Sequence, residues 1–453
     1  MSRLGALACA LGVAAGAGAC TGTSGTVQLA LTTAPGSTVL DAAQTLRLTI
    51  TAPRTVTEAT RASDGSFDLA IDIDATQTTG AVVVEGLDAT GATIAVGESP
   101  PFPLSAISAK VVVYMAAPRS FGAAPLALDA ARDGVTVVAL PYGGVLAGGR
   151  DAAGAATDEL HIYNAFDHTL AAGKALPLIR SDMTGALGTS GLVYLFGGRD
   201  GPGAATGTLW RFDPTQAPDG AYTDLGTHAD LARAGQVALL VDTEEFVISG
   251  APALDLAGVD GTLTARADLA MAPATAAGVL ASDGVRTVVF AGAAAGGGGV
   301  TRLRNGVVDT LQVTGAARTD HAVVGLANGK VAIVGGLLAG APTLDALVLD
   351  AATGTATTVT GALSTPRLAP TAVATRRYVV VAGGTDAAGA VISTADVLDA
   401  TTLALVATVP MVVGRTGAAA LALPNEQILF VGGRDATGAP SDLIELFTPD
   451  APP

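Results

Sequence analysis

Residues 331–336 read Val-Ala-Ile-Val-Gly-Gly, a short apolar run that ends in a pair of glycines. Similar runs recur along the chain and make seven copies, whose final glycines are 49, 52, 42, 44, 48 and 49 residues apart. These glycines are Gly149, Gly198, Gly250, Gly292, Gly336, Gly384 and Gly433. A period of this length indicates a supersecondary unit that is repeated in space, because one such unit cannot bury its apolar face alone.

A series of arginines is in phase with these glycines. In six of the seven repeats an arginine precedes the final glycine by 17 or 18 residues; the six are Arg132, Arg180, Arg233, Arg318, Arg367 and Arg415. Each arginine is followed by an apolar stretch, a turn and the run that ends in glycine, and two more apolar stretches lead to the next arginine. Short runs bounded by Gly, Asp and Pro are typical of strands. Four strands per repeat predict one blade of a propeller.

The repeats resemble the kelch family. The matching elements are the glycine pair that closes the second strand, the arginine before the first strand, and an aspartate at the end of the third strand, as at Asp350 and Asp399. The resemblance covers residues 118–449 and implies an all-β fold with a seven-bladed kelch-like β-propeller. Residues 125–128 form an apolar piece before the first repeat, and we expect them to be the outer strand of the last blade. Such a strand would join the two ends of the ring and protect its open edges.

Residues 26–117 show a different pattern. Apolar residues alternate with smaller or polar ones at 27–31, 46–50 and 67–73, and further apolar runs lie at 81–84, 94–96 and 111–114. A period of two is typical of half-buried strands. Several such strands without a helical pattern predict a small immunoglobulin-like β-sandwich. We expect this domain to be a stalk for the propeller at residues 118–453.

The N-terminus has the form of an export signal. Arg3 is followed by an apolar stretch at 4–15 and small residues at 17–19, and Cys20 comes next. The segment resembles a bacterial lipoprotein signal, which implies that residues 1–19 are removed, that Cys20 is lipidated and that 20–25 form a tether. The protein would then be anchored in the outer membrane, on its periplasmic face or at the cell surface. An ordinary secretory peptidase could cut at the same place, so the alternative is a secreted protein with one free thiol.

Composition excludes two classes of partner. The formal net charge is −16, from 24 Lys and Arg against 40 Asp and Glu. We expect no binding to nucleic acid, because phosphate recognition needs a cationic surface. Hydrophobic residues make up 49% of the chain, but no stretch after residue 20 approaches the ~20 apolar residues that span a bilayer. Contact with a membrane is therefore expected only through an N-terminal lipid.

Motifs of catalysis are scarce in this sequence. None of the four histidines, His161, His168, His228 and His321, forms a metal-binding pair on one element. Neither a Gly-x-Ser-x-Gly motif nor a phosphate loop of the Lys-Ser/Thr type occurs. A β-sandwich before a seven-bladed kelch propeller also resembles galactose oxidase, but the radical copper mechanism of that family requires a cysteine cross-linked to a tyrosine. The mature chain has only Cys20, so that mechanism is excluded. We predict no cofactor and no metal, and we favour a binding protein over an enzyme without deciding the question.

The turn after the glycine pair has an Asp-x-x-Gly pattern at 151–154, 200–203, 386–389 and 435–438. Aspartate can cap its own turn and glycine can adopt positive φ, so we interpret this pattern as turn chemistry. Calcium binding is the alternative, but each turn offers one carboxylate where the ion needs six or more oxygens.

The arginine series suggests where a ligand would bind. In the kelch architecture the loop before the first strand lies beside the central channel, so the six arginines are expected to surround its mouth. One alternative is structural, with each arginine bonded to a neighbouring blade or a nearby aspartate. The other is an anion-binding face, because guanidinium groups bind carboxylate or phosphate in bidentate fashion. We predict an exported binding or scaffolding protein that recognises a protein or glycan, including anionic ones. The alternative is a propeller-type enzyme acting on a carbohydrate, which would need an acid, base or metal set at the channel.

Overall fold

The structure is a computed structural model that describes residues 28–65, 67, 79–103, 110–269, 275–292 and 299–452. Cys20, the predicted signal segment and tether, and most of the predicted strand at 67–73 lie outside these residues. Regular structure within them is β-strand, apart from two short 3-10 helices, η1 (Ala229–Leu231) and η2 (Ala267–Leu269). The predicted all-β class is therefore confirmed. Among the described residues, no helix has the length and apolar character needed to cross a membrane.

Each sequence repeat forms a four-stranded antiparallel sheet. The first three sheets consist of β10 (Thr136–Leu140), β11 (Gly143–Ala147), β12 (Leu160–Asn164) and β13 (Thr169–Ala172); β14 (Thr184–Leu187), β15 (Val193–Phe196), β16 (Thr208–Asp213) and β17 (Ala221–Thr227); and β18 (Ala238–Asp242), β19 (Glu245–Ile248), β20 (Ala253–Ala257) and β21 (Thr262–Arg266). The next three consist of β22 (Thr275–Leu280), β23 (Arg286–Ala291), β24 (Val300–Arg304) and β25 (Val307–Leu311); β27 (Ala322–Gly325), β28 (Lys330–Val334), β31 (Ala346–Asp350) and β32 (Ala356–Val359); and β33 (Thr371–Ala374), β34 (Tyr378–Ala382), β35 (Thr394–Asp399) and β36 (Leu405–Pro410). The fifth repeat adds a small sheet of β26 (Arg318–Thr319), β29 (Leu337–Leu338) and β30 (Ala341–Pro342).

The seventh sheet joins the two ends of this region. It consists of β37 (Ala419–Ala422), β38 (Ile428–Val431), β39 (Ile444–Thr448) and β9 (Ser120–Ala123), so its outer strand precedes the first repeat. The outer strand is thus β9 and does not lie at residues 125–128 as the sequence suggested. In that segment the Leu128 N–H donates to the Asp442 carbonyl oxygen at 2.9 Å.

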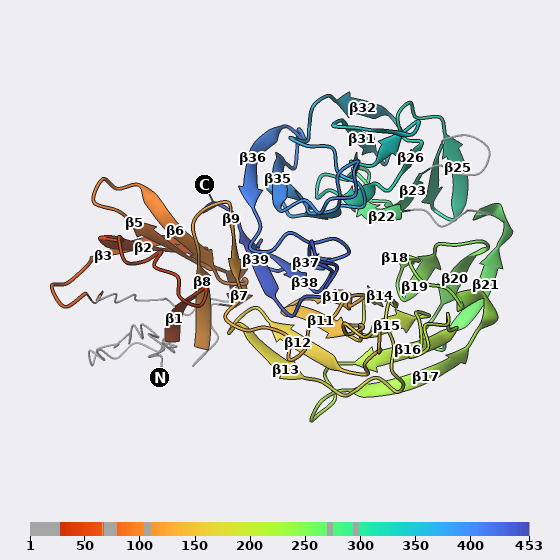
Figure 1. Ribbon diagram of the computed structural model, residues 1–453, viewed down its shortest axis with the longest axis horizontal. Coiled ribbons are helices and arrows are strands. Elements are labelled where there is room, and N and C mark those ends of the chain that lie inside the picture. Colours follow the sequence, from red (N-terminus) through yellow and green to blue (C-terminus); the bar gives the residue numbers. More distant parts are fainter. Residues whose placement is uncertain are drawn as a thin grey trace.

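The seven sheets lie around a common centre (Figure 1). Their first strands contact one another in cyclic order, from β10 through β14, β18, β22, β27 and β33 to β37 and back to β10. The same backbone hydrogen bond connects the second repeat to the first and the first repeat to the last. The Arg180 N–H donates to the Thr157 carbonyl oxygen of the preceding repeat at 2.9 Å, and the Arg132 N–H donates to the equivalent Ser441 of the last repeat at 3.1 Å.

The glycine pairs lie where consecutive repeats meet. In the sixth repeat Gly383 and Gly384 have φ values of 60° and 78°. A Cβ on Gly383 would lie 2.1 Å from the carbonyl oxygen of Arg415, and a Cβ on Gly384 would lie 2.4 Å from that of Leu368. The Gly384 N–H donates to the Arg415 carbonyl oxygen at 3.2 Å. Only glycine permits this combination of positive φ and close backbone approach, which explains why the pair marks the repeat.

The strands before β9 form the N-terminal unit, which lies beside the ring of sheets (Figure 1). One sheet has the order β3-β2-β5-β6, and two smaller ones pair β1 with β8 in parallel and β4 with β7. The bounds are β1 (Gln28–Thr33), β2 (Thr45–Thr51), β3 (Arg54–Thr60), β4 (Thr79–Gly80), β5 (Val82–Leu87), β6 (Thr93–Glu98), β7 (Phe102–Pro103) and β8 (Lys110–Met115). Leu46, Leu48 and Ile50 of β2 are buried in its core, as their alternation predicted.

The two ends of the ring differ in what they contact. Within each sheet the strands alternate in direction, so the turns between first and second strands and between third and fourth strands share one end. The N-terminal unit binds that end: the Val112 N–H donates to Phe166 between β12 and β13, at 2.7 Å. The glycine pairs follow the second strands and so lie at the opposite end, which we call the glycine face.

Candidate functional site

The six arginines predicted to bind a ligand occupy equivalent places before the first strands of their sheets. Their exposed fractions are 3% for Arg132, 4% for Arg180, 1% for Arg318, 0% for Arg367 and 1% for Arg415, while Arg233 is half-buried. Five of the six guanidinium groups are therefore almost entirely withdrawn from solvent.

The buried guanidinium groups bond within their own repeats. Arg318 Nη1 donates to the carbonyl oxygens of Gly335 at 3.1 Å and Asp345 at 2.6 Å, which flank the connection between the second and third strands. Arg367 and Arg415 donate to the corresponding carbonyl oxygens of their repeats. Burial lowers the pKa of Arg318, as it does for Arg180 and Arg233, although arginine stays charged in proteins.

Arg132 is held by acidic side chains at the edge of the first sheet. Its Nη2 donates to Asp129 at 2.5 Å and also to Glu159. Asp129, Glu159 and His161 bring one possible metal ligand each within 4.8 Å of one another. The guanidinium already supplies a cation to both carboxylates, and burial lowers the pKa of His161. This cluster therefore binds a cation that belongs to the chain itself.

These contacts bear on the two alternatives for the arginine series. They favour the structural alternative. They differ from it in one respect, because the arginines join strands within one repeat and do not reach the neighbouring repeat. Arg233 follows the same rule, because its Nη1 donates to the Pro252 carbonyl oxygen at 3.0 Å. Arg180 Nη1 donates to the adjacent Ile179 at 2.7 Å, and its Nε lies 3.4 Å from Thr208 Oγ1 in the third strand of its repeat. Ligand binding by these six residues stays a prediction, and the buried five present no free guanidinium to a ligand.

A different set of arginines lies open on the glycine face. Arg150, Arg199 and Arg434 each come directly after a glycine pair, in the first, second and seventh repeats. Each forms an isolated β-bridge with the residue that follows the repeat's buried arginine, as Arg150 does with Asp133, and a second bridge with a residue of its own loop, as Arg150 does with Ala156. The three repeats are neighbours because β9 and the Arg132 contact join the seventh repeat to the first. The arginines therefore form one continuous arc.

A cavity of about 660 Å³ lies beside this arc. Its lining comes from the loops before β10, β14, β18 and β37, whose strands surround the centre of the ring in Figure 1, and from the loops after β11 and β15 that carry Arg150 and Arg199. Gly134, Asp182, Gly235 and Gly417 line it and all have positive φ, between 54° and 71°. Each of these residues stands two places after an arginine of the repeat series, so each loop turns sharply at the same point.

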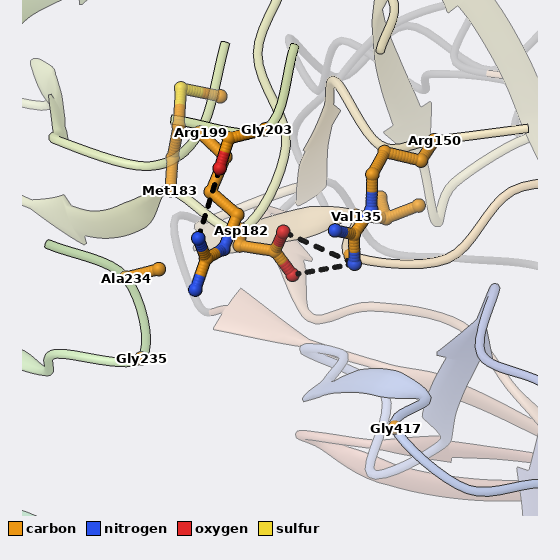
Figure 2. A pocket seen from close by; sticks show the side chains of 10 residues that line it. Val135, Arg150, Asp182, Met183, Arg199, Gly203, Ala234, Gly235 and Gly417 are labelled. Carbon is orange, nitrogen blue, oxygen red and sulfur yellow. Dashed lines mark hydrogen bonds and ion pairs between the residues drawn. The ribbon is translucent and has the colours of Figure 1, made fainter. Parts of the chain in front are cut away.

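Figure 2 shows the charged groups at the cavity, where the carboxylate of Asp182 points toward Arg150. Arg150 Nη2 lies 3.3 Å from Asp182 and 3.4 Å from Asp133, distances that indicate weak pairing. Asp133 is bound more closely by Arg434, at 2.8 Å. Arg199 donates to the Gly203 carbonyl oxygen at 3.0 Å and has no carboxylate partner among the described residues.

Cations are therefore in excess over carboxylates at this site. Arg150 and Arg199 are partly exposed and keep donors that no strong partner occupies. Guanidinium groups in such a place can accept a carboxylate, sulfate or phosphate with two parallel hydrogen bonds. Asp182 is the one carboxylate in the described lining, which contains no histidine, serine or cysteine, and Asp182 Oδ2 accepts a hydrogen bond from the buried Ser181 hydroxyl at 2.9 Å. The arrangement suits recognition of an anion.

Arg150, Arg199 and Arg434 directly precede three of the Asp-x-x-Gly turns and were not among the residues predicted to bind a ligand. The signal that could have identified them is the residue directly after each glycine pair, which is arginine in three repeats and Leu337 or Thr385 in others. The three arginines lie close together only because the seventh repeat is beside the first in the structure.

The Asp-x-x-Gly turns agree with the interpretation as turn chemistry. Asp151 Oδ1 accepts the N–H groups of Ala153 at 2.8 Å and Ala155 at 2.9 Å, and Asp386 makes the same pair of bonds in its own turn.

In comparisons with known proteins, no family model and no curated protein matches this chain, so its function must be argued from the geometry of the glycine face.

Proposed function

We propose that this chain is an exported, lipid-anchored binding protein, whose seven-bladed kelch-like propeller follows a small immunoglobulin-like sandwich. The glycine face of the propeller recognises an anionic group on a protein or glycan. The observation that carries this proposal is the convergence of Arg150 and Arg199 on one cavity, with Arg434 joined to Arg150 through Asp133.

Two observations support the propeller. The inner strands contact one another in a closed cyclic order, and the last sheet is completed by β9 from before the first repeat. Both features are typical of propellers, which leave only short, protected sheet edges. The N-terminal unit, with its separate four-stranded sheet and core, supports a distinct domain at residues 26–117.

The position of the N-terminal unit supports the choice of face. It contacts the ring through Val112 and Phe166 at the end opposite the glycine pairs. This contact therefore places the described part of the N-terminal unit at the end of the ring opposite the glycine face. If the protein is tethered through Cys20, its cavity stays accessible to a large partner.

The anchor has a direct test. Intact-mass spectrometry of the mature protein should give a chain that begins at Cys20 and carries lipid, and replacing Cys20 with Ser should release the protein from membranes. An unmodified thiol on a secreted chain would instead establish plain secretion.

The binding proposal is tested with three named probes: poly-L-glutamate for a protein carboxylate, a heparin oligosaccharide for an acidic glycan and dextran as a neutral control. Calorimetry should show that an anionic probe binds and that added salt weakens the binding. The variants Arg150→Gln and Arg199→Gln should each weaken it by ~1–3 kcal/mol, as expected for a charge-assisted hydrogen bond.

Arg286→Gln is the matched control, because Arg286 is exposed, lies outside the cavity and has no ion pair within the described part of the chain. Circular dichroism should show that all three variants remain folded. The proposal fails if neither anionic probe binds more tightly than dextran, or if Arg286→Gln weakens binding as much as the cavity variants do.

The alternative is a propeller-type enzyme that acts on a carbohydrate. It would require a paired acid and base, and Asp182 is the one carboxylate of the described cavity lining. A screen with chromogenic glycosides, comparing the unsubstituted protein with Asp182→Asn, would detect such an activity.

A further inference from the structure

Two arginines of the glycine face pair with carboxylates that come from the following repeat. Arg434 of the seventh repeat lies 2.8 Å from Asp133 of the first repeat. Arg150 of the first repeat lies 3.3 Å from Asp182 of the second repeat. Asp133 and Asp182 stand one and two places after the buried arginines of their repeats. Each of these two cations therefore meets a carboxylate from one short loop of its neighbour.

The series ends at Arg199 of the second repeat. The corresponding two places in the third repeat are Ala234 and Gly235, which follow Arg233 and carry no carboxylate. Both residues line the same cavity as Arg199 (Figure 2). Arg199 Nη1 donates to the Gly203 carbonyl oxygen at 3.0 Å, and Arg199 forms no ion pair within the described part of the chain. At this position the following repeat thus offers the arginine no carboxylate.

The second and third repeats join in the same way as the first and second. The Gly198 N–H donates to the Arg233 carbonyl oxygen at 3.2 Å, and the equivalent bond from the Gly149 N–H to the Arg180 carbonyl oxygen measures 2.9 Å. The residue two places after each arginine has positive φ, which is 71° at Gly235 and 54° in the second repeat. A carboxylate beside Gly235 would therefore meet the arginine of the preceding repeat, as it does between the first two repeats.

The charges of this series show what kind of anion would complete it. Three arginines, Arg434, Arg150 and Arg199, accompany the two carboxylates of Asp133 and Asp182, which leaves one positive charge in excess. A single carboxylate neutralises that excess, whereas a phosphate monoester carries roughly two negative charges and would exceed it. A carboxylate also presents two oxygens in one plane, which match the fork of a guanidinium group.

We propose that the cavity of the glycine face binds one carboxylate of its ligand at Arg199, beside Ala234 and Gly235, in the place that an aspartate takes beside Arg150 and Arg434. This inference rests on the proposed function and narrows it, because the anion that the cavity recognises is then a carboxylate. An acidic side chain of a protein and a uronic acid of a glycan both supply that group.

The variant Gly235→Asp tests this site by supplying the carboxylate from the chain itself. A Cβ at Gly235 meets nothing within 4 Å, and aspartate already adopts positive φ at the equivalent Asp182. Calorimetry should follow binding of the full chain to poly-L-glutamate and to polygalacturonate at physiological salt. We expect the variant to weaken binding more than about tenfold, because its new side chain competes for Arg199.

Gly417→Asp is the matched control. Gly417 lines the same cavity, stands two places after Arg415, has a φ of 66° and would place a Cβ with nothing within 4 Å. The residue after the glycine pair of the preceding repeat is Thr385, so this variant adds the same charge where no arginine corresponds to Arg199. It should weaken binding less than about threefold, because salt screens a charge that makes no direct contact. Circular dichroism should show that both variants remain folded.

A second comparison uses the Arg199→Gln background, in which Gly235→Asp should weaken binding no further than Gly417→Asp does. Equal effects of the two aspartate variants on a probe that binds the unsubstituted protein would overturn the site at Arg199 and leave the proposed function intact. Dextran sulfate that binds as tightly as the carboxylate probes, with the same loss in Gly235→Asp, would overturn the choice of a carboxylate. If no anionic probe binds more tightly than dextran, the proposed function itself fails. Binding of poly-L-glutamate alone would identify a protein as the source of the carboxylate, and binding of polygalacturonate alone a glycan.

Discussion

Arg367 Nε donates to Asp396 Oδ2 at 3.1 Å, and neither side chain is exposed to solvent. Asp396 also accepts from Ser364 Oγ at 2.6 Å and Thr408 Oγ1 at 2.8 Å, so its carboxylate is fully bonded. The pair links the loop before the first strand of the repeat to its third and fourth strands. The arginine that marks the repeat in the sequence therefore joins the strands of one sheet.

Removing one partner should be strongly destabilising. Asp396→Ala leaves the Arg367 guanidinium as an uncompensated buried charge, and we expect the free energy of unfolding to fall by ~3–5 kcal/mol. Urea unfolding followed by circular dichroism measures this. The control is Glu58→Ala, which removes the exposed ion pair with Arg47 and should change stability by less than ~1 kcal/mol. Similar effects of the two substitutions would contradict a structural role for the buried pair.

The glycine pairs allow a matched comparison. Gly383→Ala places a Cβ against the Arg415 carbonyl oxygen at positive φ, whereas Gly389 also has positive φ but meets nothing within 4 Å. We expect Gly389→Ala to destabilise by ~1–2 kcal/mol from backbone strain alone, and Gly383→Ala to destabilise by clearly more. Thermal unfolding of both variants measures the difference. If they lose equal stability, close approach of the next repeat is not what requires glycine at 383.

Closure of the ring depends on a few aromatic contacts of β9. The Phe121 ring packs 5.3 Å from that of Phe430 and 5.4 Å from that of Phe447, centroid to centroid. Phe121→Ala removes both contacts, and we expect a loss of roughly 3 kcal/mol. Deleting residues 118–131 should lower the melting temperature much further, because the edge of β39 is then exposed. A truncated chain that melts with the full-length protein would show that β9 does not hold the ring together.

Much of the fold was predictable because its signals are local. Positive φ and backbone crowding make glycine obligatory at Gly383 and Gly384, and the same need returns in each repeat. The arginine before the first strand also recurs at a fixed position, because its buried guanidinium group donates hydrogen bonds to two carbonyl oxygens. The outer strand of the last sheet was misplaced because Phe121 pairs with a strand more than 300 residues away, and such pairing leaves no local pattern.

The candidate site was harder to predict. The buried arginines could be identified from their regular spacing, because each repeat makes the same structural contact at the same position. A binding residue follows no such rule, because a ligand touches only some repeats. Arg150 and Arg434 are 284 residues apart in sequence, yet both bond to the carboxylate of Asp133. Only the cyclic order of the sheets brings them together.

A buried histidine makes stability depend on pH. His168 is 4% exposed, its Nδ1 lies 2.6 Å from Tyr163 Oη, and its Nε2 is buried without a partner. Burial lowers the pKa of His168 to about 4, against 6.5 for an exposed histidine. The unfolded chain therefore takes up a proton below pH 6.5 that the folded chain refuses until about pH 4. Stability from this group is complete above pH 6.5 and is lost as the pH falls toward 4.

His168→Asn should remove this dependence, because asparagine does not titrate and tolerates the positive φ of 53° at this position. Between pH 7 and pH 5 the free energy of unfolding should fall by roughly 2 kcal/mol more in the unsubstituted protein than in the variant. Urea unfolding at the two pH values measures the difference. Glu98 and His321 titrate in both proteins, so their contributions cancel when the variant is subtracted. Parallel losses of stability in the two proteins would mean that His168 takes up its proton in the folded state at its ordinary pKa, and that its buried contacts open in mild acid.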